Sequence, residues 1–131
     1  MPGTDFTREL TLTHDLRIGD TVLVRDRRMR GFALWHSAPL AAGRGQEEVR
    51  VLKLVAENFE AFQLVVGMVQ EAAMAQGIRR IALRCQSNYA EAYLWLVEQG
   101  FRAHWTDLRM TLRGFPEPVA KEGVVWSNWE I

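Results

Sequence analysis

The sequence has little of several features that mark particular classes of protein. Its 131 residues include a single cysteine, Cys85, so it has neither a disulfide framework nor a zinc site with several cysteine ligands. Sixteen basic and sixteen acidic side chains give a formal net charge of +0, which provides no electrostatic basis for binding nucleic acid or an anionic membrane. No apolar run approaches the roughly 18 residues of a membrane span, and no basic-then-apolar leader opens the chain. These absences favour a soluble, cytoplasmic protein.

The composition that remains is typical of a globular domain. Apolar residues make up 48% of the chain and charged residues 24%, close to the average for folded proteins. One domain usually has roughly 100–200 residues, so we expect residues 1–131 to form one domain. A chain of this length buries about two-thirds of its unfolded surface and needs no disulfide or metal to hold it together.

Periodicity and turn residues predict the order of the elements. The clearest helix covers residues 58–76, where apolar side chains recur at i, i+3, i+4 and i+7 and Gly77 follows as a C′ glycine. The polar connection Arg25–Arg30 predicts a hairpin, and residues 37–46 read as a loop. In chain order we expect a short helix at 5–10 capped by Asp5, strands at 21–24, 31–35 and 49–56, the helix at 58–76, a strand at 78–85, a helix at 88–99, and strands at 101–112 and 124–129.

This order predicts a mixed α/β (α+β) sheet with helices on its faces. The strands at 49–56 and 78–85 are joined by a helix, and a helical crossover connects parallel neighbours. The preceding hairpin requires antiparallel neighbours in the same sheet.

Two helix-to-strand junctions resemble those of the GNAT family, the acetyl-CoA-dependent N-acetyltransferases. They are Ala75–Ile78 and Glu98–Phe101, the second being a helix end followed by Gly-Phe and a strand. Asn88 resembles the family's asparagine after the strand that ends at Cys85. The resemblance covers most of the chain and implies a GNAT-like fold.

The resemblance extends to the C-terminal part of the chain, whereas part of the family's N-terminal region has no counterpart in this sequence. Residues 105–110 and 126–129 resemble the second half of a tandem GNAT protein. A complete GNAT domain has an extra strand and a further helix before the first strand found here, so the implied fold is N-terminally shortened. The sheet edge then needs cover, which predicts a homodimer or a missing N-terminal GNAT domain as partner.

The resemblance also implies where acetyl-CoA would bind. Backbone donors near residues 54–56 would polarise the thioester carbonyl, and Asn88 would help to hold the cofactor arm. The loop that holds the pyrophosphate in the family corresponds to residues 57–62. The cofactor-binding residues implied in this way are Leu54, Val55, Ala56, Ala61, Phe62 and Asn88.

The implied pyrophosphate loop departs from the family pattern of Gln/Arg-x-x-Gly-x-Gly/Ala. Glu57 and Glu60 stand where a basic residue and the first glycine are expected, and Phe62 replaces the second small residue. Two carboxylates near a helix N-terminus stabilise the helix but repel a phosphate. The loop is therefore degenerate, and acetyl-CoA is an uncertain cofactor.

The family's general acid is also absent from its usual place. Many GNAT enzymes carry a tyrosine one turn before the Gly-Phe junction, a position that Leu96 occupies here. Tyr93 would replace it only if the helix were rotated or the ligand shifted, and Glu57 is a candidate base for an amine. Because a helix-start carboxylate explains Glu57 more simply, Glu57 and Tyr93 are weak catalytic candidates.

Two functions therefore remain open. One is an acetyl-CoA-dependent N-acetyltransferase, and the other is a non-catalytic GNAT-fold module for dimerisation or ligand sensing. An RNA-binding domain would rest on the arginine-rich hairpin alone, which lacks interleaved aromatics.

Other reactive side chains have simpler interpretations. His14, His36 and His104 are too dispersed in sequence to indicate a metal site, so no metal is expected. Cys85 reads as an inert buried thiol. Asp107 and Arg109 would share a strand face and form an ion pair or line a polar pocket.

Overall fold

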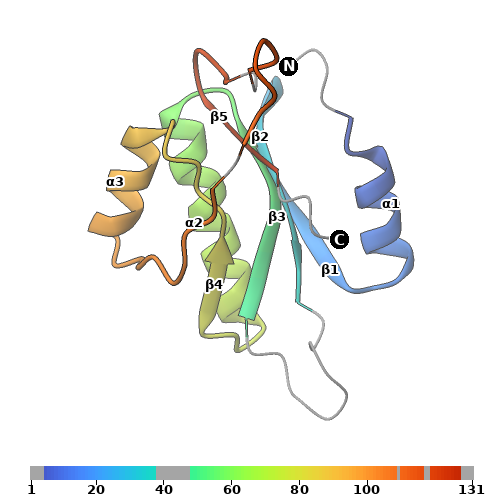
Figure 1. Ribbon diagram of the computed structural model, residues 1–131. Helices are drawn as coiled ribbons and strands as arrows, with labels where there is room; N and C mark the ends of the chain where they lie inside the picture. The colour runs from blue at the N-terminus through green and yellow to red at the C-terminus, as the bar shows by residue number, and fades with distance from the viewer. Residues whose placement is uncertain (1–4, 38–47, 109, 117–118, 128–131) are drawn as a thin grey trace.

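The computed structural model describes residues 5–37, 48–108, 110–116 and 119–127, and they form a sheet covered by helices on both faces (Figure 1). No helix in these ranges combines the length and apolarity needed to cross a membrane. The elements are α1 (Thr7–Asp15), β1 (Gly19–Asp26), β2 (Arg28–His36), β3 (Glu48–Ala56), α2 (Phe59–Ala75), β4 (Arg80–Leu83), α3 (Ala90–Glu98) and β5 (Val124–Ser127).

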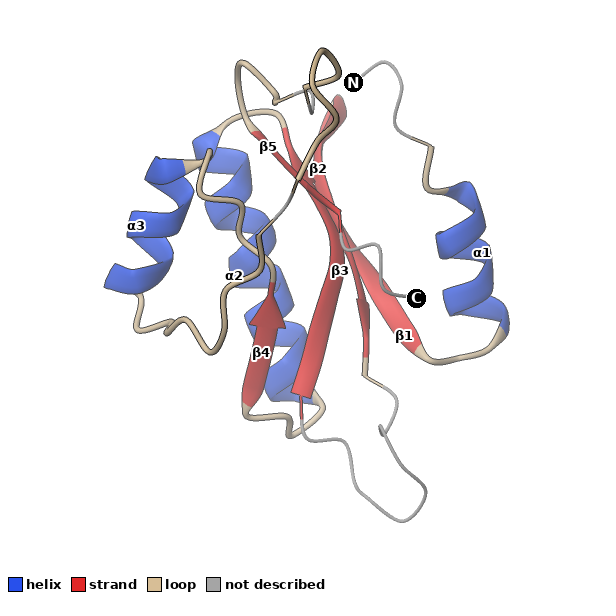
Figure 2. Ribbon diagram, in the orientation of Figure 1, coloured by secondary structure: helices blue, strands red, loops and turns tan. Residues whose placement is uncertain are grey.

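The sheet has the order β1-β2-β3-β4, with β5 also paired to β3. The β1–β2 and β2–β3 pairs are antiparallel, whereas β3 and β4 are parallel because α2 connects them. In Figure 2, α2 and α3 lie on one side of the sheet and α1 lies on the other. The structure therefore confirms the predicted mixed sheet and its parallel pair.

The main core lies between the sheet and α2. Apolar residues of α2 at helical spacing, among them Phe62, Val65 and Val69, are almost fully buried. Asn58 caps the helix, since its side-chain oxygen accepts a hydrogen bond from the Ala61 N–H at 2.8 Å. The predicted helix at 58–76 thus corresponds to the observed element with its two caps included.

A bulge in β3 changes which side chains face this core. Leu34 pairs with Lys53 but Trp35 pairs with Val51, so Leu52 is the extra residue. Val51 before the bulge and Leu54 after it both belong to the core cluster. Lys53 consequently faces the opposite side of the sheet.

Lys53 is buried there with polar and aromatic neighbours. Its Nζ lies 3.6 Å from a carboxylate oxygen of Glu9 and 2.8 Å from the hydroxyl of Ser127, and it lies 5.4 Å from the centre of the Phe6 ring. A buried ammonium group requires such partners. These contacts, with the Phe6–Phe32 ring pair at 5.7 Å, attach α1 to the sheet.

The expected strand at 101–112 is wrong. In the described part of this range the chain forms no strand, and Trp105, Leu108 and Met110 are 75%, 93% and 91% exposed. Alternation of apolar and polar residues fits a strand only where a neighbouring strand supplies hydrogen bonds, and none does so here among the described residues.

Several smaller expectations also need adjustment. The fourth strand is shorter than 78–85, and the first helix extends to Asp15. Asp5 is not its N-cap, because Phe6 holds that position; the Asp5 carboxylate instead accepts hydrogen bonds from the N–H and hydroxyl of Thr7. Residues 38–46 of the expected loop, and 128–129 of the last strand, lie outside the described residues.

Candidate functional site

The candidate site lies where β3 and β4 separate. β4 pairs with residues 48–51 of β3, and β5 pairs with residues 53–56. Because β2 pairs along the other edge of β3, β4 and β5 share one edge. β5 therefore occupies the edge of β3 beyond the end of β4, as Figure 1 shows for the red strand that crosses β3.

The backbone positions implied for acetyl-CoA are those that pair with β5. Leu54 lies opposite Trp126, Val55 opposite Val125, and Ala56 opposite Val124, all in antiparallel register. Ladder hydrogen bonds use the N–H and C=O groups of a strand edge. The backbone hydrogen-bonding groups along this edge are therefore paired with β5 of the same chain.

An aromatic cluster holds β5 in this position. Trp126 is 3% exposed. The centre of its ring lies 5.1 Å from the centre of the Phe62 ring and 6.4 Å from that of the Tyr89 ring, both with edge-to-face geometry. Trp95 of α3 packs against Phe62 with 5.6 Å between the two ring centres. Phe62 is thus a core residue between α2, α3 and β5.

Tyr89 also contacts the chain that leads into β5. Its hydroxyl accepts a hydrogen bond from the Ala120 N–H at 3.3 Å. The indole N–H of Trp126 is buried and has no hydrogen-bond partner among the described residues. A lone buried donor costs stability, so packing of the ring must outweigh that cost.

The start of α2 carries a network of ion pairs. Arg30 contacts Glu57 at 2.6 Å and Glu60 at 2.9 Å, and Arg28 contacts Glu57 at 3.0 Å. The hydrogen bonds that Arg30 donates to Glu57 and, with a smaller effect, to Glu60 raise the pKa of Arg30. The carboxylates of Glu57 and Glu60 are therefore neutralised by arginines of the hairpin.

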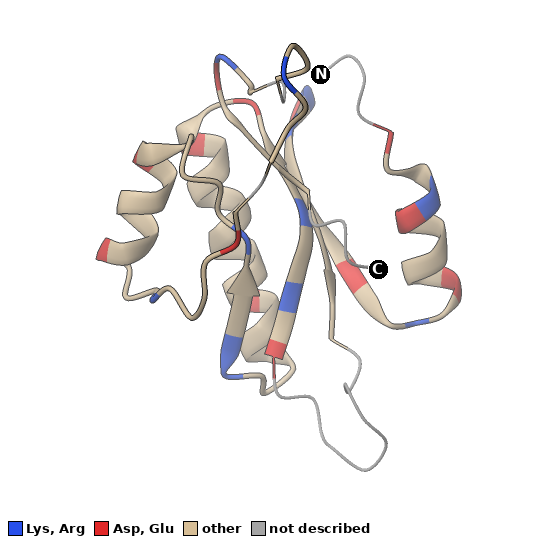
Figure 3. Ribbon diagram, viewed as in Figure 1, with Lys and Arg blue, Asp and Glu red and all other residues tan. Residues whose placement is uncertain are grey.

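A solvent-open cavity of about 550 Å³ adjoins this network. It is lined by Asp26, Arg27, Arg28, Arg30, Glu57 and Asn58. Acidic and basic residues are interspersed over the rest of the described chain (Figure 3). The cavity combines three guanidinium groups with two carboxylates, so an anion would have to compete with the internal ion pairs.

The remaining predicted site residues do not converge. Ala61 is fully buried in the core, whereas Asn88 is exposed in the turn before α3. Leu96 is 3% exposed and packs in the core, and Tyr93 on the same helix is 43% exposed. No described contact joins Tyr93 to Glu57.

The other reactive side chains are also accounted for. Asp107 contacts Arg84 at 3.2 Å, while Arg109 lies outside the described residues. Cys85 is partly buried, and burial raises the pKa of its thiol to about 11. Within the described ranges no three histidine, cysteine or acidic side chains are grouped to hold a metal.

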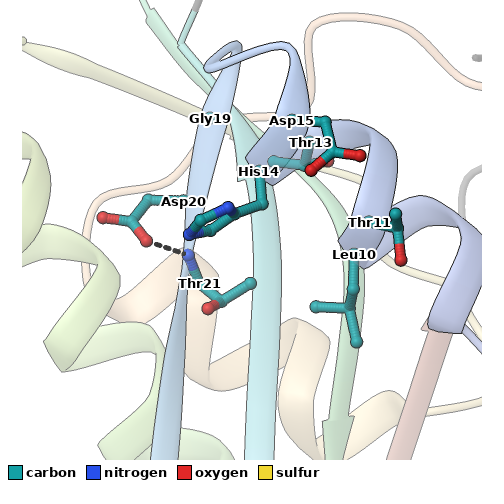
Figure 4. A pocket seen from close by; sticks show the side chains of 8 residues that line it. All are labelled: Leu10, Thr11, Thr13, His14, Asp15, Gly19, Asp20 and Thr21. Carbon is teal, nitrogen blue, oxygen red and sulfur yellow. Dashed lines mark hydrogen bonds between the residues drawn. The ribbon is translucent and has the colours of Figure 1, made fainter.

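A second cavity, of about 400 Å³, lies between α1 and β1 (Figure 4). His14 and Asp20 are among its lining residues, and Asp20 accepts a hydrogen bond from the Thr21 N–H at 2.8 Å. Thr13 is buried beside it and lies 3.0 Å from Nε2 of His36. The contact between Thr13 and His36 attaches α1 to the sheet.

Sequence reasoning missed the closure of the β3 edge and the partners of Lys53. Pairing of β5 with β3 joins residues about 70 positions apart, for which local patterns carry no signal. A lysine within the otherwise apolar run of residues 51–56 was the available sign of the buried contact with Glu9 and Ser127.

Comparison with known proteins shows what the fold is. No protein-family profile and no curated protein matches the sequence. Among solved structures, a tetramutant of the BH1408 protein from Bacillus halodurans has a TM-score of 0.63 at 14% identity, covering 85% of this chain and 76% of its own. An acetyltransferase from Trypanosoma brucei has a TM-score of 0.60 at 19% identity, with 85% and 82% covered.

A third similar structure is the ribosomal-protein-alanine N-acetyltransferase from Brucella melitensis biovar Abortus 2308. Its TM-score is 0.53 at 10% identity, and the match covers 73% of this chain and 72% of that one. At such identities the likeness concerns the fold alone. The mixed sheet, its crossover helix and these acetyltransferase neighbours together show that the chain has a GNAT-like fold.

Proposed function

We propose that this chain is a GNAT-fold protein that does not transfer acetyl groups and serves as a non-catalytic module for dimerisation or ligand sensing. The observation that supports this most directly is the pairing of β5 with residues 53–56 of β3. The resemblance assigns the thioester to the same backbone edge. Groups already bonded in a ladder are not available to polarise a bound carbonyl.

The side chains near this edge support the same proposal. Leu96 has no proton to donate, and Tyr93 faces solvent rather than the core. Both carboxylate oxygens of Glu57 already accept from arginines, at 2.6 and 3.0 Å. None of the three is placed as a free acid or base next to residues 54–56.

A second candidate, an acetyl-CoA-dependent N-acetyltransferase, is favoured by one observation. The cavity at the start of α2 is lined by Arg27, Arg28 and Arg30, and guanidinium groups bind phosphate well. For this activity the chain would have to release β5 from β3, and the arginines would have to exchange carboxylates for phosphates.

Thermal unfolding with and without millimolar acetyl-CoA separates the two candidates. The non-catalytic module should show no change in Tm and no thiol release when primary amines are added. A ligand at about a hundred times its Kd adds roughly 2.7 kcal/mol, which for a chain this long raises the Tm by on the order of 10 °C. Such a rise together with thiol release in the unaltered protein would contradict the proposal.

Two tryptophan variants show whether β5 is what closes the site. Trp126→Ala removes the ring that packs on Phe62 and Tyr89, whereas Trp105→Ala removes a ring that is 75% exposed. Each variant is compared with its own ligand-free Tm. Stabilisation by acetyl-CoA in Trp126→Ala alone would show that β5 blocks acetyl-CoA binding. Stabilisation in neither variant would attribute the lack of acetyl-CoA binding to the loop at 57–62.

A further inference from the structure

Five large apolar side chains are exposed in the part of the chain that connects α3 to β5. They project from the irregular segment that follows α3, drawn in tan in Figure 2. We call them the 105–115 surface; they are Trp105, Leu108, Met110, Leu112 and Phe115, and each is between 71% and 93% exposed.

This surface is large for a protein that acts alone. Monomeric proteins rarely expose contiguous apolar patches above a few hundred Å². Side chains of this size and exposure present on the order of 800 Å², which is about what each partner contributes to an interface of standard size. Covering such an area would give an interface in the size range of specific complexes.

Several features of the chain favour a second copy as the cover. The formal net charge of +0 means that two copies do not repel one another, and proteins near zero charge self-associate readily. Within the described residues β4 pairs only with β3, so its other edge is not paired there. An unpaired edge favours association with an extended segment of another chain.

The 105–115 surface belongs to a segment of that kind. Apolar and polar residues alternate from 107 to 113 as in a strand, yet in the described residues the segment pairs with no strand. The ion pair between Arg84, which follows β4, and Asp107 places the segment near the end of β4. Each copy thus presents a strand edge and a strand-like apolar segment close together, as a two-fold interface requires.

We propose that the 105–115 surface is the contact between two copies of this chain in a symmetric homodimer. The inference names the partner of the non-catalytic module and in that respect rests on the proposed function. Its readout is molecular mass, whereas that of the proposed function is stabilisation by acetyl-CoA, so the failure of either is distinguished from the failure of the other.

The test is light scattering of the whole chain after gel filtration. The unaltered protein should have twice the 15.0-kDa mass of one chain at micromolar concentration. The double variant Leu108→Glu/Met110→Glu should have the mass of one chain, because four carboxylates would meet in the interface. Met74→Glu places one carboxylate on a side chain that is 76% exposed in α2, away from this surface in the sequence, and it should remain a dimer.

Each other outcome overturns the inference. A single-chain mass for the unaltered protein would mean that this face is not covered by a second copy. A dimer that survives Leu108→Glu/Met110→Glu would place the contact on another face. Because both side chains are more than 90% exposed, the fold should persist, and Leu112→Glu provides an independent disruption of the same surface if circular dichroism shows otherwise.

Discussion

Cys85 is a thiol whose surroundings suppress its reactivity. Its sulfur lies 3.7 Å from the backbone oxygen of Gln86, and burial raises its pKa to about 11. Only the thiolate attacks disulfides and alkylating agents. At pH 8 a thiol with this pKa is about 0.1% ionised, against about a quarter for an ordinary cysteine.

We therefore expect Cys85 to react with an aromatic disulfide reagent roughly 20-fold more slowly than a free cysteine at pH 8. The figure combines the smaller thiolate fraction with the higher nucleophilicity of a more basic thiolate. Stopped-flow absorbance measures the rate, which should rise about tenfold per pH unit up to about pH 11. The urea-unfolded chain is the control and should react as a free cysteine; a plateau near pH 8.5 in the folded protein would refute the expectation.

At the scale of elements, the position of β5 depends on the turn before it. Gly123 has a φ of 75°, a conformation that favours glycine. A Cβ at this position would lie 2.6 Å from the carbonyl carbon of Glu57 and would also collide with the carbonyl oxygen of Ala56. The absence of a side chain is what lets β5 approach the end of β3.

Gly123→Ala should therefore lower the free energy of unfolding by about 2 kcal/mol, from backbone strain together with displacement of β5. Hydrogen exchange at residues 53–56 should become faster, which reports on the β3 edge directly. Gly67→Ala is the matched control, because a Cβ there meets nothing within 4 Å and the position lies inside α2. That change should be neutral or stabilising by up to about 1 kcal/mol. Unchanged stability and exchange in Gly123→Ala would show that β5 tolerates a side chain at the turn.

Elements set by nearby residues could be predicted from the sequence, and those set by distant partners could not. The second helix was predictable because its cap Asn58, its apolar period and Gly77 all lie within or beside it. Residues 101–112 carry an equally regular alternation but lack a partner strand among the described residues. The bulge at Leu52, which places Lys53 opposite Glu9, depends on how β2 and β3 pair, and alternation alone does not reveal it.

The candidate site shows the same division. The carboxylates at positions 57 and 60 and the leucine at 96 were visible as departures from a family pattern. Their partners were not, since Arg28 and Arg30 reach Glu57 from a hairpin about 30 residues earlier. The closure by Trp126 spans more than 60 residues between the contacting rings of Phe62 and Trp126.

At the scale of the whole molecule, the attachment of α1 couples stability to pH. His36 on β2 is partly buried beneath α1, with Nε2 3.0 Å from the hydroxyl of Thr13. Burial lowers the pKa of His36 below the ordinary value of 6.5. In the unfolded chain the imidazole regains its ordinary pKa, so below pH 6.5 the unfolded state binds this proton more readily than the folded state.

The free energy of unfolding should therefore be highest above pH 6.5 and should fall as the pH decreases from there through the lowered pKa of His36. Urea unfolding at intervals from pH 8 to pH 5 measures this slope. His36→Gln should flatten the slope between pH 6.5 and 5.5, whereas His104→Gln, which alters an exposed imidazole, should leave it in place. The Asp5 carboxylate, whose pKa is lowered by hydrogen bonds from the side chain and backbone of Thr7, affects stability only at more acidic pH. An equal slope in His36→Gln and the unaltered protein would mean that the junction of α1 with the sheet does not control this pH dependence.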